Sequence, residues 1–243
     1  MTMRRMTQNR TLLLAAATVI CALTAVASAP WALDLPVLNF VFKPLTTALV
    51  IAYAWPRGRD QPVQRRWVLV GLSLSWVGDV ALLWPQQGFL PGLVSFLLAH
   101  LAYLVAFTRE QRLAVRVLPF VVYALVAAAV LWHLWPGVPP ALRLPVLAYV
   151  LCLSAMAAQT GALALAGDAR GRVLARVLDR KPVLVLAVGG ALFMVSDALL
   201  AMNKFAGPLP LANLWILSTY WAAQWCIASW LRPATTAESP PAR

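Results

Sequence analysis

Long apolar runs, each bounded by charged residues, proline or glycine, recur eight times along the chain. Each run approaches the ~20 residues that an α-helix needs to cross a bilayer. Pro36, Pro145 and Pro182 stand at or beside the start of a run, and the first helical turn tolerates proline because its N–H has no partner there. The pattern predicts helices over residues 11–29, 36–54, 67–84, 89–107, 117–135, 144–166, 182–202 and 211–231.

These helices leave only short connections, so the sequence predicts an all-α polytopic membrane protein with a single transmembrane domain over residues 1–243. We expect the polar, proline-containing tail over 233–243 to be disordered. The first run resembles a secretory signal, because arginines precede it and Ala27-Ser28-Ala29 follows it. Pro30 disfavours cleavage there, and the run is long enough to span, so we expect the first helix to be retained.

Composition supports the membrane interpretation. Hydrophobic residues make up 62% of the chain, charged residues 12%, and the mean hydropathy is +0.76. A soluble domain has about a quarter of its residues charged, and a disordered chain has far fewer apolar residues. The composition therefore excludes an ordinary soluble domain and a disordered chain.

The net charge of +12 could indicate nucleic-acid binding, but its distribution indicates membrane topology instead. Seventeen of the 20 Lys and Arg residues lie in the N-terminus, the C-terminus or the connections that follow even-numbered helices. Only Arg143 and Lys204 lie on the opposite side, and Lys43 lies inside a span. Because cytoplasmic loops collect cations, both termini are expected in the cytoplasm, in a bacterial inner membrane. No nucleic-acid partner is expected.

Two short segments resemble each other. Residues 77–82 read VGDVAL in the third helix, and residues 195–200 read VSDALL in the seventh. Helices four apart run in the same direction, so the match indicates a parallel repeat of two four-helix halves.

Four ionisable residues lie within the predicted spans: Lys43, Asp79, His100 and Asp197. Inserting such a residue into the membrane costs ~2.5–3.5 kcal/mol, so its presence in a span indicates a structural or functional role. Counted along their helices, all four fall near the midplane or in the outer half of the membrane. Other polar side chains share their level or their helix faces: Thr47, Ser75, Tyr103, Tyr149, Tyr220 and Gln224. The sequence therefore predicts a polar pocket inside the bundle.

The residue types favour acid–base chemistry. A zinc hydrolase of the three-histidine kind needs three ligands, and the chain has two histidines, so no metal or other cofactor is expected. No G-x-S-x-G context supports a serine nucleophile. Two carboxylates with a lysine suit general acid–base catalysis, and Lys43 could also bind phosphate. The alternatives are structural: Lys43 could reach the interface or pair with Asp79, and His100 could be a core residue.

The same positions resemble the YhhN-like family of membrane proteins, which includes the lysoplasmalogenases. The matching residues are Lys43-Pro44-Leu45-Thr46-Thr47, Ser75-Trp76-Val77-Gly78-Asp79, Phe96, Ala99-His100, Tyr103, Gly190-Ala191-Leu192-Phe193, Ser196-Asp197, Tyr220 and Gln224. The resemblance implies a compact bundle of eight transmembrane helices. It also implies hydrolysis of the vinyl ether bond of a lysoplasmalogen or related lysolipid, with membrane lipid and water as the other partners.

By this resemblance Asp79 and Asp197 are the catalytic pair. The residues expected to bind substrate are Lys43, Thr47, Ser75, His100, Tyr103, Tyr149, Ser196, Tyr220 and Gln224. Cleavage of a vinyl ether needs one general acid and one carboxylate that activates water. Two other classes stay open: a transporter, since a parallel repeat and a midplane charged site are transporter features, and a lipid-binding protein without turnover.

Overall fold

The computed structural model describes residues 3–29, 31–84, 86–166 and 175–233. Eight α-helices and one short 3-10 turn, Trp135–Gly137, make up the regular structure of these residues. The helices are α1 (Met3–Ala27), α2 (Pro36–Ala54), α3 (Pro62–Ala81), α4 (Phe89–Thr108), α5 (Val117–Leu134), α6 (Pro140–Ala166), α7 (Ala175–Phe205) and α8 (Ala212–Trp230). The tail expected to be disordered lies outside the described residues from 234 onward.

Each predicted range falls on one helix, but several helices begin earlier than the hydropathy pattern predicts. Pro36 starts α2 as expected, whereas Pro145 and Pro182 lie inside α6 and α7. The start of α6 is Pro140 and the start of α3 is Pro62. The extra turns are polar or proline-containing, which hydropathy assigns to loops although the backbone continues its hydrogen bonding through them.

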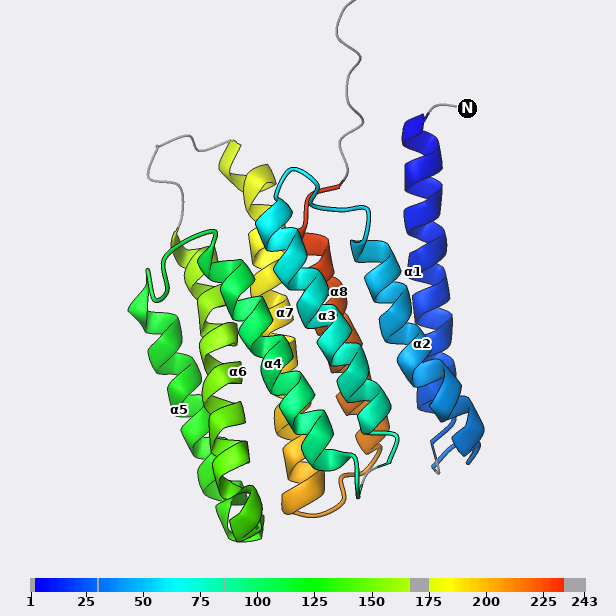
Figure 1. Ribbon diagram of the computed structural model, residues 1–243, viewed down its shortest axis with the longest axis vertical. Helices are drawn as coiled ribbons and strands as arrows, with labels where there is room; N and C mark the ends of the chain where they lie inside the picture. Colours follow the sequence, from blue (N-terminus) through cyan, green and yellow to red (C-terminus); the bar gives the residue numbers. More distant parts are fainter. Residues whose placement is uncertain (1–2, 30, 85, 167–174, 234–243) are drawn as a thin grey trace, which may run out of the picture.

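The helices run side by side, and consecutive helices are antiparallel (Figure 1). The pairs α1–α2 and α5–α6 lie at the two edges of the bundle, and α3, α4, α7 and α8 lie between them. Glycines allow close packing in this middle part. A Cβ at Gly78 of α3 would lie 2.5 Å from the Phe96 ring of α4, and one at Gly190 of α7 would lie 2.2 Å from Thr160 of α6. Small residues at such contacts are typical of membrane helices.

The surface of the bundle is apolar. Large exposed side chains lie along the outer faces of the helices, with Leu125 of α5 66% exposed and Leu151 of α6 63% exposed. Among the described residues, six helical segments are long and apolar enough to cross a membrane; they lie in α1, α2, α4, α5, α6 and α7. An apolar outer surface on hydrogen-bonded helices is what the bilayer core requires. The fold is therefore that of an all-helical polytopic membrane bundle.

Candidate active site

A polar cavity of about 270 Å³ lies between α2, α3, α4, α7 and α8. Both intramembrane aspartates line it, Asp79 from α3 and Asp197 from α7, together with Lys43 from α2 and Tyr220 from α8. These four residues are up to 177 positions apart in the chain. The packing of the helices thus brings into one cavity the charged groups that the sequence places at a common depth, apart from His100.

Asp79 is held by two hydroxyl groups. Thr47 of α2 donates to its Oδ2 atom over 2.6 Å, and Tyr220 of α8 donates to the same atom over 2.7 Å. The indole Nε1 of Trp221 donates to the Thr47 hydroxyl over 3.2 Å, which orients that hydroxyl toward the aspartate. Asp79 is only 2% exposed. Hydrogen bonds to a buried carboxylate stabilise its charged form and fix its orientation.

Lys43 is buried on α2 and is close enough to Asp79 for their charges to attract. No ion pair joins the two side chains among the described residues, so the simple structural ion pair is not formed. Lys43 instead faces the cavity that both aspartates line. Trp76 of α3 donates its indole N–H to the Pro44 carbonyl over 3.0 Å, beside the point where the proline interrupts the backbone hydrogen bonding of α2.

Asp197 has different surroundings. Tyr149 of α6 donates its hydroxyl to the Oδ2 atom over 2.5 Å, and Nε2 of His100 lies 3.9 Å from the same oxygen. His100 is fully buried, with its ring edge-on to those of Tyr149 and Phe193. Within the described part of the chain, neither ring nitrogen of His100 has a hydrogen-bond partner. Asp197 therefore takes one hydroxyl donor where Asp79 takes two.

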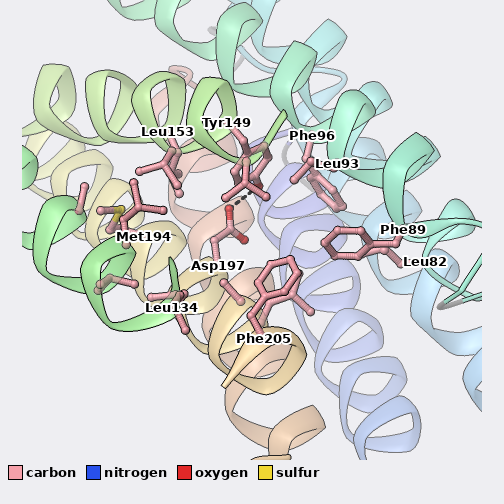
Figure 2. A pocket seen from close by; sticks show the side chains of 18 residues that line it. Leu82, Phe89, Leu93, Phe96, Leu134, Tyr149, Leu153, Met194, Asp197 and Phe205 are labelled. Carbon is pink, nitrogen blue, oxygen red and sulfur yellow. Dashed lines mark hydrogen bonds between the residues drawn. The ribbon is translucent and has the colours of Figure 1, made fainter. Parts of the chain in front are cut away.

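A second, apolar cavity meets the polar one at Asp197. It is narrow, about 80 Å³, and its wall is made by α4, α5, α6 and α7 with the end of α3 (Figure 2). Figure 2 shows the Asp197 carboxylate, hydrogen-bonded to Tyr149, in a wall that is otherwise apolar. The two cavities share Leu82, Phe89, Phe96, Asp197 and Leu200. A ligand with an alkyl chain and a polar group could occupy both, with its junction beside Asp197.

Several residues expected to bind substrate lie elsewhere. Ser75, His100, Tyr103 and Gln224 are fully buried and do not belong to the wall of the polar cavity. Tyr103 donates to Gln224 over 2.7 Å, and its hydroxyl lies 3.4 Å from that of Ser75. These groups form a buried polar chain between α3, α4 and α8 behind the aspartates. Ser196 does line the cavity, but its hydroxyl donates to the Ile216 carbonyl over 3.0 Å.

Three polar residues that are not among those expected to bind substrate also line the polar cavity. These are Asn203 and Lys204 at the end of α7 and Asn213 at the start of α8. A periodicity signal was present: Asp197 and Lys204 are seven residues apart, as are Asn213 and Tyr220, and residues two turns apart share a helix face. No group of three or more potential metal ligands occurs among the described residues.

Comparison with known proteins identifies a family. Residues 38–231 match the model of the YhhN family. A pig protein named lysoplasmalogenase TMEM86B is 38% identical over 154 residues, which are 63% of this chain and 58% of the pig protein. Human lysoplasmalogenase TMEM86A is 35% identical over 162 residues, 66% of this chain and 63% of the human protein.

A bacterial relative is similar to the same degree. Mycobacterium tuberculosis lysoplasmalogenase is 33% identical over 161 residues, covering 63% of this chain and 54% of the mycobacterial protein. The chain thus matches less than two thirds of the length of each of these relatives. Their names are those of enzymes, and they lend no support to the transporter alternative. No solved structure matches the chain.

Proposed function

This chain belongs to the YhhN family, and from that premise we propose that it is a membrane hydrolase that cleaves the vinyl ether bond of a lysoplasmalogen or a related lysolipid. The observation that carries the proposal is the meeting of two cavities at Asp197. One is apolar and narrow, and the other is polar and lined by both aspartates and two lysines. The names of the mammalian and mycobacterial relatives support the same substrate class.

The cavities suit the two parts of a lysolipid. Its single hydrocarbon chain would occupy the apolar cavity, where burial of each methylene group contributes about 0.8 kcal/mol. Its glycerophospho group would occupy the polar cavity, with Lys43 and Lys204 as candidate phosphate partners. The vinyl ether joins these two parts, so it would lie at the junction, beside Asp197.

The surroundings of the aspartates support different roles. Asp197 lines the apolar cavity as well as the polar one, and it is the only ionisable residue besides Tyr149 in that apolar wall as described. An apolar wall favours a neutral carboxylic acid that can donate a proton. Asp79 accepts two hydroxyl hydrogen bonds where Asp197 accepts one, and hydrogen bonds of this kind favour the ionised carboxylate that can accept a proton. We therefore assign the acid role to Asp197 and the base role to Asp79.

The reaction then balances without a cofactor. Asp197 transfers its proton to the vinyl carbon that does not carry oxygen, which leaves an oxocarbenium ion that a carboxylate can stabilise. Asp79 removes a proton from water as the water oxygen bonds to the oxocarbenium carbon, giving a hemiacetal. The hemiacetal hydroxyl returns a proton to Asp197 while Asp79 protonates the departing glycerol oxygen. The products are a fatty aldehyde and a glycerophospho compound.

We propose further that all eight helices cross the membrane, as two parallel four-helix halves. The pattern of packing supports this repeat. In the first half α1 packs on α2, α2 on α3 and α3 on α4, and in the second half α5 packs on α6, α6 on α7 and α7 on α8. Between the halves, the second helix of each packs on the fourth helix of the other, which gives the contacts α2–α8 and α6–α4. The site follows the same rule, because Asp79 contacts α2 and α8, and Asp197 contacts α6 and lies beside α4.

The proposed orientation places the site on the outer side of a bacterial inner membrane. Seven arginines gather at one end of the bundle, in the α2–α3 connection, the start of α3 and the α4–α5 connection: Arg57, Arg59, Arg65, Arg66, Arg109, Arg112 and Arg116. Lys204, at the end of α7, belongs to the polar cavity at the opposite end. Since cations collect on the cytoplasmic side, the cavity would open away from the cytoplasm, with both termini inside.

The test is direct. Protein purified in detergent is incubated with a lysoplasmalogen, and the fatty aldehyde and the glycerophospho product are measured together. The saturated alkyl ether analogue of the same chain length serves as substrate control, because it has no vinyl group to protonate. The Asp79→Asn, Asp197→Asn double variant, purified in the same way, sets the background. Aldehyde formation no faster than that background would reject the proposed activity.

A further inference from the structure

The polar cavity continues toward the connection between α1 and α2. An outer cavity of about 310 Å³ shares Lys43, Leu82, Asn213 and Leu217 with it. The remaining wall of the outer cavity is made by the end of α1, the α1–α2 connection, the start of α2 and the end of α3. Three cavities thus lie next to one another: the apolar and polar cavities share Asp197 in their walls, and the polar and outer cavities share Lys43.

Two of the described residues lining the outer cavity are ionisable, and their charges are opposite. Lys43 lies where this cavity joins the polar one, and Asp34 lies in the α1–α2 connection. Asp34 is exposed, and among the described residues its carboxylate forms no ion pair and accepts no hydrogen bond. It is therefore available to a ligand that extends outward past Lys43.

The connection holds Asp34 at this place. The backbone N–H of Asp34 donates to the Ala29 carbonyl over 3.2 Å, and that of Leu35 donates to the Ser28 carbonyl over 3.1 Å. Asp34 itself has a φ of +49°, a left-handed conformation that aspartate and asparagine adopt more readily than most residues. The turn is thus closed on backbone carbonyls directly after α1, and α1 itself packs against α2.

From this order of charges we propose that Asp34 selects substrates whose phosphodiester carries a cationic amine or quaternary ammonium group. The inference rests on the proposed function, whose reactive group sits beside the aspartates. A phosphate held by Lys43 directs its next substituent into the outer cavity. A carboxylate there attracts a cationic substituent and repels an anionic one, so it favours one head group and disfavours another.

Asp34 lies outside the residues that match the family model, which begin at 38. The proposed role is therefore assigned to Asp34 of this chain and is not taken from the family match. It also gives the connection after α1 a role in the site, because this connection supplies Ser28, Ala29 and Asp34 to the outer cavity.

The expected effect is modest, because Asp34 is exposed. Removing one partner of an exposed ion pair changes the binding constant by about two- to fivefold. Asp34→Asn should therefore raise KM for amine-bearing substrates by about that factor and leave kcat unchanged, because Asp34 is remote from the reacting bond. Asp34→Lys replaces attraction by repulsion, so it should shift the ratio of kcat/KM between cationic and anionic head groups by about tenfold or more.

The experiment compares three alkenyl substrates of one chain length: glycerophosphoethanolamine, glycerophosphate and glycerol without phosphate. The wild type, Asp34→Asn and Asp34→Lys are assayed in neutral detergent at low salt. Glu110→Gln is the matched control, because it removes an equally exposed negative charge in the α4–α5 connection, at the opposite end of the bundle. The glycerol substrate should respond to none of the variants, and Glu110→Gln should match the wild type on all three.

A binding arm separates this inference from the proposed activity. Saturated alkyl analogues of the ethanolamine and phosphate substrates, which the proposed chemistry cannot cleave, are titrated while intrinsic tryptophan fluorescence is recorded. If the wild type binds the ethanolamine analogue better and Asp34→Lys reverses the order, the inference stands even if no vinyl ether is cleaved. If Asp34→Lys binds and cleaves with wild-type head-group preference, the inference is wrong, whether or not the protein is a lysoplasmalogenase.

Discussion

Tyr149 donates its hydroxyl to Oδ2 of Asp197 across the α6–α7 interface, over 2.5 Å. The Oδ1 atom of Asp197 has no hydrogen bond among the described residues. One oxygen is thus held by the fold, in a side chain that lines both cavities. A proton carried on Oδ1 could reach a substrate carbon without breaking the bond that orients the side chain.

Replacing either aspartate should abolish most turnover. Asp79→Asn and Asp197→Asn keep the side-chain volume but remove the acid–base group, and general acid–base catalysis contributes about 10²–10⁴-fold. We expect kcat to fall by that amount, measured by aldehyde release. Asp60→Asn, in the exposed α2–α3 connection, is the control and should keep the wild-type rate. Near-normal rates in both site variants would refute the two-aspartate mechanism.

The tyrosines that hold the aspartates should matter for turnover. Tyr149→Phe and Tyr220→Phe each remove a hydrogen bond to a carboxylate, and such bonds contribute about 1.5–3 kcal/mol, or about 10- to 100-fold in kcat. Tyr103→Phe removes a buried bond to Gln224 behind the site. It should lower the melting temperature in detergent more than it lowers kcat. Equal kcat losses in all three variants would mean that these hydroxyls only stabilise the fold.

The apolar cavity should set the accepted chain length. Ala127 of α5 lines it and is buried, so Ala127→Phe would fill part of the cavity and favour shorter chains. Ala128, the next residue, is exposed on the outer face of α5, and Ala128→Phe should leave the chain-length profile unchanged. Rates over a series of lysolipids of increasing chain length distinguish the two variants. A shared profile would show that the chain does not occupy this cavity.

Solvent isotopes should mark the product in two positions. Protonation of the vinyl carbon in heavy water should place one deuterium on the carbon next to the aldehyde, because the proposed donor, Asp197, exchanges its proton with solvent. Attack by water places one solvent oxygen in the aldehyde. The aldehyde must be reduced to the alcohol within the turnover time, and added unlabelled aldehyde measures exchange. Mass spectrometry of the alcohol reads both labels, and an aldehyde without solvent deuterium would exclude carbon protonation.

The orientation can be read with reporter fusions. Fusions after Arg59 and after Arg112 should report the cytoplasm, and fusions after Gly137 and after Gly207 should report the opposite side. This result is expected if all eight helices cross the membrane and cations remain inside. A fusion after Arg232 provides the check on helix number. If it reports the outer side while the other four behave as expected, α8 does not cross.

Much of the architecture follows from the sequence by itself. Each membrane span must satisfy its own backbone hydrogen bonds and present apolar side chains to lipid. Hydropathy is therefore a local property of the sequence, and each helix can be located without knowledge of the others. The same holds for the intramembrane charges. Asp79 and Asp197 stand out in apolar runs because a charge there is costly, whatever its neighbours are. The start of α6 shows where local signals fail, since Pro140 rather than Pro145 occupies its first turn.

The site itself was decided by tertiary structure. The position of each residue along its helix does not show that Thr47 and Tyr220 both donate to one oxygen of Asp79. Nor does it show that Tyr149 donates to Asp197. Nor could it separate Ser75 and Tyr103, behind the cavity, from Asn213, on its wall. Hydrogen-bond partners and cavity walls depend on how several helices rotate and pack against one another. Close glycine contacts and side-chain volumes set that packing, and neither is readable from the hydropathy of a single helix.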